Sequence, residues 1–287
     1  MRMIDAPDPN TRIPTFKAPP GACDAHCHVF GPGDVFPYAG TRKYTPPDCP
    51  KGKLRELHTI LGIDRAVIVQ ASCHGTDNSA MLDAIASGDG RYRGVCNAAI
   101  EFSEDYFMEL HSCGVRGVRF NFVRHLGGAP NLDQLWRIIE RIGALPWHVE
   151  LHFDASDLLE YRSVIDAMPL PVVIDHMGRV PVIDGVNQAP FQSLLQELRD
   201  NDRLWVKVSG AERISAEGAP FTDAVPFAAA CVEAAPDRCL WGTDWPHPNV
   251  KTMPNDADLV DIIPKMIPDS DLQQKVLVDN PARLYGF

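Results

Sequence analysis

Two histidines separated by one residue stand near the start of the chain, in the apolar run Ala25-His26-Cys27-His28-Val29. Such a run is typical of a β-strand, in which alternate side chains lie on the same face of the sheet. We therefore expect His26 and His28 side by side, where they can hold one metal ion or polarise one carbonyl group. For such a pair taken alone, two hydrogen-bonded or exposed histidines are the simpler interpretation.

Three more residues that could bind a metal ion lie at the ends of apolar runs later in the chain, namely His152, His176 and Asp244. If these runs are parallel strands of a barrel, their carboxyl ends meet at one mouth and bring the three residues to His26 and His28. His26, His28, His152 and Asp244 would then suffice as ligands of a divalent ion, most simply zinc, with an open position for water. Such an ion lowers the pKa of bound water and polarises a carbonyl. The alternative is that each residue only caps its strand through hydrogen bonds.

A second group of residues could bind a ligand. Arg119 lies late in the fourth candidate strand, Arg213 follows the seventh, and Ser72 and His74 follow the second. An arginine binds a carboxylate or sulfonate through two parallel hydrogen bonds, so a chain of net charge −11 that directs arginines into its pocket is expected to bind a small anion. Surface arginines and ordinary polar loop residues are the alternative.

These residues need a scaffold, and short apolar runs alternate with helical patterns from residue 23 onward. The eight strand candidates are residues 23–29, 66–70, 94–100, 115–122, 148–153, 171–176, 204–209 and 239–244. The helix candidates are residues 51–61, 78–86, 103–113, 131–142, 155–167, 190–199, 225–235, 257–266 and 272–278. Ser103 and Asn131 are the expected N-caps of the helices at 103–113 and 131–142, and Gly143 follows the end of the latter helix.

Eight strand–helix units in 287 residues predict an α/β protein with a (β/α)8 TIM barrel, a single domain over residues 21–287. A doubly wound open sheet is the alternative, but no Gly-x-Gly-x-x-Gly follows any strand candidate. Residues 1–20 are polar and proline-rich, and we expect an extended segment. The stretch 30–50, rich in glycine and proline, follows the first strand and is expected to cover part of the barrel mouth.

The composition is that of a globular protein with a sizeable core, because hydrophobic residues make up 45% and charged residues 23%. The net charge of −11, without a run of lysines and arginines, argues against nucleic acid or an anionic membrane as a partner. No apolar stretch approaches the roughly 20 residues of a membrane span, and the first 20 residues contain no signal-peptide core. We therefore expect a cytoplasmic protein; the sequence indicates no oligomeric state.

The eight cysteines are expected to be free and mostly buried thiols, because most fall inside strand or helix candidates. Strand alternation places Cys23 and Cys27 on the face opposite His26 and His28. A second close cysteine pair that would complete a metal cluster is missing from the sequence.

Five segments together resemble the amidohydrolase superfamily, and within it the branch of lactone-opening hydrolases that act on 2-pyrone-4,6-dicarboxylate. They are DAHCHVFGP (24–32), QASCHGTDN (70–78), GVRFNF (117–122), IDHMGR (174–179) and WGTDWPHP (241–248). The resemblance covers nearly the whole chain after about residue 20. It implies a TIM-barrel hydrolase that opens a small acidic lactone from aromatic-compound catabolism.

The resemblance also implies roles for individual residues. Asp244 would take a proton from the attacking water, while His26, His28 and His176 would surround the scissile carbonyl. The residues expected to contact the anionic substrate are Arg119, Arg213, Ser72, His74, Arg124 and His125.

The chain departs from the dicarboxylate-lactonase pattern at two places. It has Arg124-His125 where the pattern has Lys-Arg, which affects a carboxylate contact, and His152 where the pattern has a tyrosine. The second change restores the strand-five histidine of metal-binding superfamily members, so a zinc ion and a metal-free mechanism both remain open. A zinc-dependent 4-sulfomuconolactone hydrolase, a sugar-acid lactone isomerase and a non-enzymatic binding protein are the alternative functions.

Overall fold

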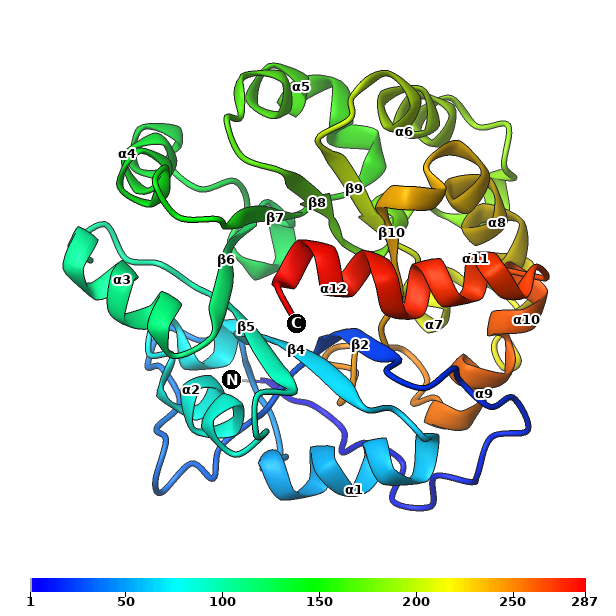
Figure 1. Cartoon of the computed structure of the whole chain (residues 1–287), viewed down its shortest axis with the longest axis horizontal. Helices are drawn as coiled ribbons and strands as arrows, with labels where there is room; N and C mark the ends of the chain where they lie inside the picture. The colour runs from blue at the N-terminus through cyan, green and yellow to red at the C-terminus, as the bar shows by residue number, and fades with distance from the viewer. Residues whose placement is uncertain (1) are drawn as a thin grey trace.

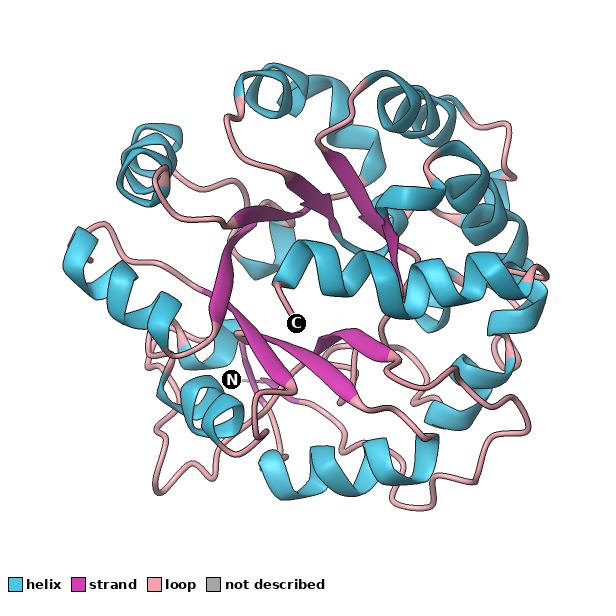
Figure 2. Cartoon of the chain, viewed as in Figure 1, coloured by secondary structure: helices cyan, strands magenta, loops and turns pink. Residues whose placement is uncertain are grey.

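Eight parallel strands lie next to one another in chain order and form a barrel, with the helices packed around its outside (Figures 1 and 2). The computed structural model describes residues 2–287. The strands are β2 (Cys23–Cys27), β4 (Arg65–Val69), β5 (Tyr92–Cys96), β6 (Val115–Asn121), β7 (His148–His152), β8 (Val172–Ile174), β9 (Leu204–Lys207) and β10 (Cys239–Leu240). This order and direction confirm the predicted (β/α)8 barrel.

The helices follow the strands in the predicted alternation. They are α1 (Lys51–Leu61), α2 (Ser79–Ala86), α3 (Glu104–Ser112), α4 (Leu132–Ile142), α5 (Leu158–Ala167), α6 (Ala189–Asp200), α7 (Ala211–Ile214), α8 (Val225–Ala234), α9 (Asp256–Asp261), α10 (Ile263–Met266), α11 (Ser270–Gln274) and α12 (Asn280–Tyr285). Ser103 and Asn131 are N-caps as predicted, because their side chains accept hydrogen bonds from Tyr106 N and Gln134 N. No helix among the described residues is long and apolar enough to cross a membrane.

The strands are shorter than predicted at their carboxyl ends. β8 ends at Ile174 and β10 at Leu240, so His176 and Asp244 lie in the loops beyond the strands. β5 runs from Tyr92 to Cys96, whereas residues 94–100 were expected to form this strand. Apolar residues therefore continue past the last hydrogen bond of the strand ladder. A sequence pattern does not distinguish these residues from the strand itself.

Two predicted helices also need correction. The helix expected at 257–266 is divided into α9 and α10, because Pro264 has no N–H for the hydrogen bond that a continuous helix requires. The helix expected at 272–278 is longer: α11 continues through a π-helical turn (Lys275–Asp279) into α12. The short helix α7 has no counterpart among the predicted elements.

The amino-terminal half of the barrel interior is apolar. Its core cluster consists of Cys23, Ala25, Val67, Val69, Val95, Val173, Trp205, Leu240 and Tyr285. Tyr285 belongs to α12, which lies across the end of the barrel (Figure 1), and its ring is 5.2 Å from that of His148 at the start of β7. This end of the barrel is closed, so a ligand can enter only from the other end.

Cys23 lies in this interior cluster and not on the face opposite His26, which corrects the expectation from strict alternation. The reason is a shift of register between Asp24 and Cys27 in the pairing of β2 with β4, typical of a β-bulge. Cys27 belongs to the outer core, as expected. All eight cysteines are free, and seven of them are buried, Cys113 being the exposed one.

The segment that precedes the barrel starts beside the loop that follows β2, runs past α9 and leads into β2. Its first residues form β1 (Arg2–Met3), which pairs with β3 (Tyr44–Thr45) inside the stretch 30–50 that follows β2. Arg12 forms ion pairs with Asp258 and Asp261 of α9, at 2.5 and 2.6 Å. The segment thus holds in place the loop that was expected to cover the mouth.

The barrel has a seam between its first and last strands, because β2 and β10 share no ladder within the described sheet. Backbone hydrogen bonds from Ala25 N to Trp241 O (2.8 Å), His28 N to Trp245 O (2.7 Å) and Asp244 N to His26 O (2.7 Å) cross it. The seam therefore runs directly beside Asp244 and the histidine pair.

The buried carboxylate of Asp24 also closes this seam. Its Oδ1 accepts hydrogen bonds from the backbone N of His26 (3.1 Å) and of Thr243 (3.0 Å). Its Oδ2 accepts one from Thr243 Oγ1 (2.6 Å) and lies 3.2 Å from Nε2 of His58 on α1. Asp24 is therefore a structural acceptor that joins β2, α1 and the chain beyond β10.

We expect Asp24→Asn to lower the free energy of unfolding by about 2–4 kcal/mol, because an amide nitrogen replaces an oxygen that faces buried donors. Urea unfolding of the variant measures this loss. Asp89→Asn is the matched control, since Asp89 is exposed. Equal stabilities of the two variants would contradict the role of Asp24.

Candidate active site

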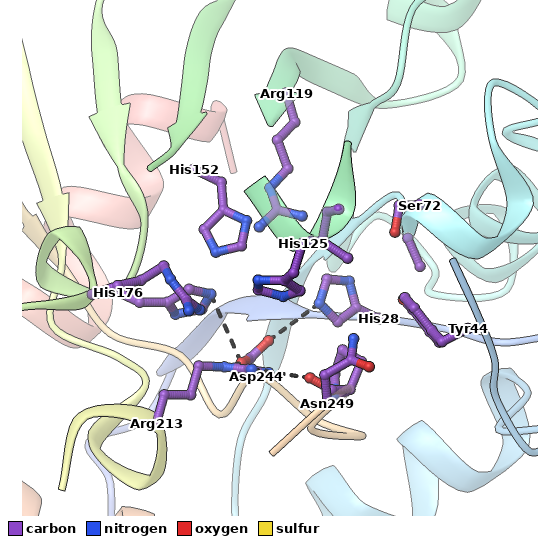
Figure 3. Close-up of a pocket in the computed structure, with 14 residues that line it drawn as sticks. His28, Tyr44, Ser72, Arg119, His125, His152, His176, Arg213, Asp244 and Asn249 are labelled. Atoms are coloured by element: carbon purple, nitrogen blue, oxygen red, sulfur yellow. Dashed lines mark hydrogen bonds and ion pairs between the residues drawn. The ribbon is translucent and has the colours of Figure 1, made fainter. Parts of the chain in front are cut away.

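A cavity opens at the carboxyl ends of the strands (Figure 3). The polar side chains that line it are those of His28, Tyr44, Ser72, Arg119, His125, His152, His176, Arg179, Arg213, Asp244 and Asn249. Histidines, arginines and one carboxylate therefore share a single cavity.

Asp244 is the carboxylate of this cavity, and its backbone φ of 64° is one that residues other than glycine rarely adopt. Its Oδ1 lies 3.2 Å from His28 Nε2 and 3.6 Å from His26 Nε2. Its Oδ2 forms an ion pair with Nε of Arg213 and lies 3.8 Å from His176 Nε2 (Figure 3). Three imidazoles and a guanidinium thus surround one carboxylate.

The protonation states of these groups follow from their surroundings. Burial opposes the ionisation of Asp244, but Arg213 and then His176 outweigh it and hold the pKa of the carboxyl well below its ordinary value of 3.8. Burial lowers the pKa of His176 to about 3, although Asp244 opposes this shift. Burial and then the charge of Arg119 lower the pKa of His152 well below 6.5. At neutral pH the site therefore holds an ionised carboxylate together with the neutral imidazoles of His176 and His152.

Hydrogen bonds to the far ring nitrogens orient two of the histidines. Nδ1 of His28 donates to Val69 O over 2.8 Å. Nδ1 of His152 donates to Asn121 Oδ1 over 3.0 Å, and Val123 N donates to the same oxygen over 3.4 Å, which identifies it as the oxygen of the amide. Nε2 of His152 thus carries a lone pair, and it has no hydrogen-bond partner among the described residues.

A left-handed turn after β8 directs His176 and Arg179 into the cavity. Residues 176–179 all have φ between 50° and 62°. This conformation costs roughly 1–2 kcal/mol for each residue other than glycine, so other contacts must stabilise it. His176 Nδ1 lies 2.9 Å from Ser209 Oγ, and Arg179 Nε donates to Asp154 Oδ1 over 2.8 Å.

Three arginines reach the cavity, each held by a partner in the protein. Nε of Arg119 donates to Oδ2 of Asp175 over 2.8 Å. Arg213 contacts Asp244 through Nε, and its Nη1 donates to Pro248 O over 3.0 Å. With Arg179, these side chains provide positioned guanidinium groups, which suit a ligand with more than one acidic group.

Most of the site residues predicted from the sequence meet at this cavity. They are His28, Ser72, Arg119, His125, His152, His176, Arg213 and Asp244. His26 is completely buried and does not line the cavity, but its Nε2 is 3.6 Å from Asp244. It therefore lies beneath the cavity floor.

The structure does not bring His74 and Arg124 to the cavity. His74 Nε2 accepts a hydrogen bond from Gly31 N (3.2 Å), and its Nδ1 donates to Pro37 O (3.2 Å), so this side chain supports the loop that follows β2. Arg124 is exposed. A residue that follows a strand in sequence need not point into the barrel mouth. This is why the expectation failed for both residues.

The predicted zinc ligands do not form a single group in the structure. Among the described residues, ligand atoms of His26, His176 and Asp244 lie within 4.8 Å of one another and form a possible ligand group. Neither His28 nor His152 belongs to this group, and one oxygen of Asp244 is ion-paired with an arginine. The residues as they stand therefore do not fit the predicted site of His26, His28, His152 and Asp244.

Sequence reasoning missed two sets of residues. Tyr44 lines the cavity from the two-residue strand β3, and Arg179 and Asn249 line it from loops; the sequence offers no periodic pattern for any of them. The second set consists of charged residues within or next to apolar strands, Glu150, Asp175 and Lys207, all completely buried. A charge inside an apolar run was the available indication, because such a residue needs a buried partner.

A chain of alternating charges extends outward from Asp244. Beyond Arg213 comes Glu212, whose Oε1 is 3.5 Å from Arg213 Nε and 3.7 Å from His247 Nδ1. His247 Nε2 is 3.0 Å from Asp256 Oδ1. Burial opposes protonation of His247, but Asp256 and Glu212 outweigh it and raise its pKa to about 10. A buried imidazolium thus fixes the loop that carries Asp244.

Comparison with known proteins defines the class to which this fold and site belong. The sequence pattern of the amidohydrolase family matches residues 23–287, so the chain belongs to the amidohydrolase family, as predicted. It is 50% identical over 285 residues to a 2-pyrone-4,6-dicarboxylate hydrolase from Comamonas testosteroni, covering 96% of this chain and 93% of the relative. It is 44% identical over 276 residues to a 4-sulfomuconolactone hydrolase from Rhizobium radiobacter, covering 95% of this chain and 92% of the relative. A crystal structure of a protein from Agrobacterium tumefaciens matches with a TM-score of 0.83 and 29% identity, covering 96% of this chain and 98% of that chain.

We expect His247→Gln to lower the free energy of unfolding by about 3–5 kcal/mol at pH 6, because it removes the cation that lies between two buried carboxylates. The pKa of His247 is raised from 6.5 to about 10 in the folded protein. The stability that it adds is therefore fully present below about pH 6.5 and is lost as the pH rises towards 10.

Denaturant unfolding of both proteins at pH 6, 8 and 10 measures this difference. His125→Gln serves as control, because the residue is exposed. A difference between wild type and His247→Gln that does not change with pH would contradict the buried imidazolium.

Proposed function

We propose that this protein hydrolyses a small acidic lactone of aromatic-compound catabolism, with 2-pyrone-4,6-dicarboxylate as the best single candidate. One observation carries the proposal: an ionised carboxylate, Asp244, lies among histidines in a cavity whose wall includes three arginines. Hydrolysis of an ester requires a base and donors for the oxyanion, and an acidic substrate requires the arginines. A relative with 50% identity, named for hydrolysis of this dicarboxylate, supports the choice.

In this proposal, Arg119, Arg179 and Arg213 bind the acidic groups of the substrate. Arg119 and Arg179 are already held by Asp175 and Asp154, so little side-chain freedom is lost on binding. Each charge-assisted contact contributes about 1.5–3 kcal/mol. The substrate is thereby placed with its lactone carbonyl over Asp244.

The chemical steps follow from the groups around Asp244. The carboxylate takes a proton from water, whose oxygen forms a bond to the lactone carbonyl carbon. An imidazole that carries its proton on Nε2 meets the negative charge that develops on the carbonyl oxygen. The ring C–O bond then breaks, and the proton passes from Asp244 to the leaving oxygen, with His176 at 3.8 Å placed to carry it. A ring-opened acid forms, and Asp244 is ionised again.

No step of this mechanism is assigned to a metal ion. The residues do not assemble the predicted zinc site, and Asp244 is already paired with Arg213 and in contact with His28. Histidine N–H groups can meet the oxyanion without an ion. Zinc remains a prediction from the sequence that elemental analysis of the purified protein tests.

A lactone that carries a sulfonate is the second candidate substrate. A relative with 44% identity is named for hydrolysis of 4-sulfomuconolactone, and His152 departs from the dicarboxylate-lactonase pattern at a residue of the cavity wall. Guanidinium groups bind sulfonates in the same two-point manner as carboxylates. Substrate assays must therefore compare the two lactones directly.

We also propose that the enzyme works in a reducing compartment, the cytoplasm. All eight cysteines are free, and free thiols in this number are typical of proteins kept under reducing conditions. The net charge of −11 favours a small ligand held in a cavity over nucleic acid or an anionic membrane.

We expect the wild-type protein to open 2-pyrone-4,6-dicarboxylate faster than 4-sulfomuconolactone or a sugar-acid lactone, and Asp244→Asn to lower kcat by about 10²–10⁴-fold. Absorbance of the ring and chromatography of the products measure hydrolysis and distinguish it from isomerisation. No turnover of any lactone, or near-normal turnover by a folded Asp244→Asn protein, would overturn the proposal.

We expect Arg213→Gln to move the acidic limb of the pH profile of kcat/KM upward by roughly one to two pH units. In the wild type, Arg213 holds the pKa of Asp244 well below 3.8, so the base stays ionised at moderately acidic pH. Without Arg213, burial dominates, the pKa of Asp244 rises, and protonation removes the base at higher pH.

Arg179→Gln is the matched control for this profile, because Arg179 lines the same cavity but pairs with Asp154. Both variants should weaken substrate binding, but only Arg213→Gln should shift the limb. Identical pH profiles for the two variants would show that Arg213 does not set the ionisation of Asp244.

A further inference from the structure

Lys207 at the end of β9 is the only lysine among the fully buried side chains of residues 2–287. Its Nζ lies 2.9 Å from Nδ1 of His26, forms an ion pair with Glu150, and is 3.4 Å from Oδ1 of Asp175. The mechanism above gives Lys207 no role. Its contact with His26 nevertheless places it one residue away from the floor of the cavity.

The surrounding charges account for an ammonium group at this depth. A buried ion costs several kcal/mol unless it is paired. Glu150 and Asp175 provide two negative charges, and Arg119, at 2.7 Å from Asp175 and 3.4 Å from Glu150, provides the second positive charge. The quartet of Arg119, Glu150, Asp175 and Lys207 is therefore electrically balanced.

The contact between Lys207 and His26 determines where the proton of the imidazole lies. An ammonium group has donors only, so at 2.9 Å from Lys207 the nitrogen Nδ1 must accept with its lone pair. A nitrogen that accepts carries no proton, so the ring is neutral. A neutral imidazole has a single N–H, which must then be at Nε2.

Two carboxylates compete for the same nitrogen. Oδ1 of Asp175 lies 3.3 Å and Oε1 of Glu150 lies 3.7 Å from His26 Nδ1. Either would require the proton on Nδ1 and would leave a lone pair on Nε2. The shorter contact with Lys207 favours the opposite arrangement.

We propose that Lys207 is a positioning residue that fixes His26 as the Nε2–H tautomer and so directs its N–H towards the carboxylate of Asp244. Nε2 lies 3.6 Å from Oδ1 of Asp244 and has no hydrogen-bond partner among the described residues. As an N–H it supports the negative charge of Asp244 from beneath the cavity, and it offers no lone pair to a metal. This inference rests on the proposed function for its substrate, but the tautomer itself does not.

The first test measures the tautomer in the wild-type protein. Long-range ¹H–¹⁵N correlation spectra of protein labelled with ¹⁵N-histidine distinguish the two tautomers, and His26→Gln assigns the signal. We expect His26 to carry its proton on Nε2. A proton on Nδ1 would overturn the proposal, whether or not the protein opens a lactone, so this failure is distinct from failure of the proposed function.

The second test removes the ammonium group while preserving the balance of charge. Lys207→Met combined with Glu150→Gln removes one cation and one anion, and Glu150→Gln alone is the matched control that keeps Lys207. In the double variant, Asp175 is the remaining carboxylate near Nδ1, so the proton should move to Nδ1. The spectrum of the control should keep the Nε2–H tautomer.

Catalysis and metal binding should change together in the double variant. Loss of the N–H that faces the catalytic carboxylate lowers kcat by about 10²-fold relative to the control, with KM changed by less than about threefold. Zinc added alone should bind the double variant at least about tenfold more tightly, because a lone pair on Nε2 is then available. Unchanged tautomer, kcat and zinc affinity would overturn the proposal; if the double variant does not fold, the wild-type spectrum decides.

Discussion

Four ionised side chains lie in the middle of the barrel, and each needs a partner of opposite charge. Arg119, Glu150 and Lys207 come from strands β6, β7 and β9, and Asp175 follows directly after β8, which lies between β7 and β9. Because an unpaired ion at this depth costs several kcal/mol, their mutual contacts fix how these strands present their side chains. Arg119 is thereby aimed at the cavity, and His26 is held beneath its floor. The charges that need one another for burial thus also place the groups that contact a substrate.

The same constraint continues outward from the catalytic carboxylate. Asp244, Arg213, Glu212, His247 and Asp256 alternate in sign from the cavity to α9. Each charge stabilises the next, so the position and ionisation of Asp244 depend on groups that a substrate does not touch. The low pKa of this carboxyl makes it a weak base that is always ionised, and the contacts around it must therefore supply part of the rate.

The alternation of apolar runs and helical patterns was enough to predict the barrel, because it reflects the burial that defines each element. It also placed His28, His152, His176 and Asp244 at one mouth, since parallel strands converge there. The pattern failed where a local irregularity or a distant partner decides the outcome. The bulge in β2 turns Cys23 inward. The burial of Lys207 is explained only by its partners on other strands, which the sequence does not identify. His74 follows a strand but supports a loop, because loop conformation is not periodic.

The seam between β2 and β10 has a consequence for the response of the protein to heat. Asp244 and the histidine pair lie on opposite sides of the one junction of the barrel that is closed by a few backbone hydrogen bonds and Asp24, without a ladder. Cooperative pairing protects the other seven junctions better against local opening. Thermal opening of the seam therefore separates the base from the imidazoles while most of the secondary structure persists. Inactivation on heating should precede melting, and the temperature limit of the enzyme is set by this junction and not by the barrel as a whole.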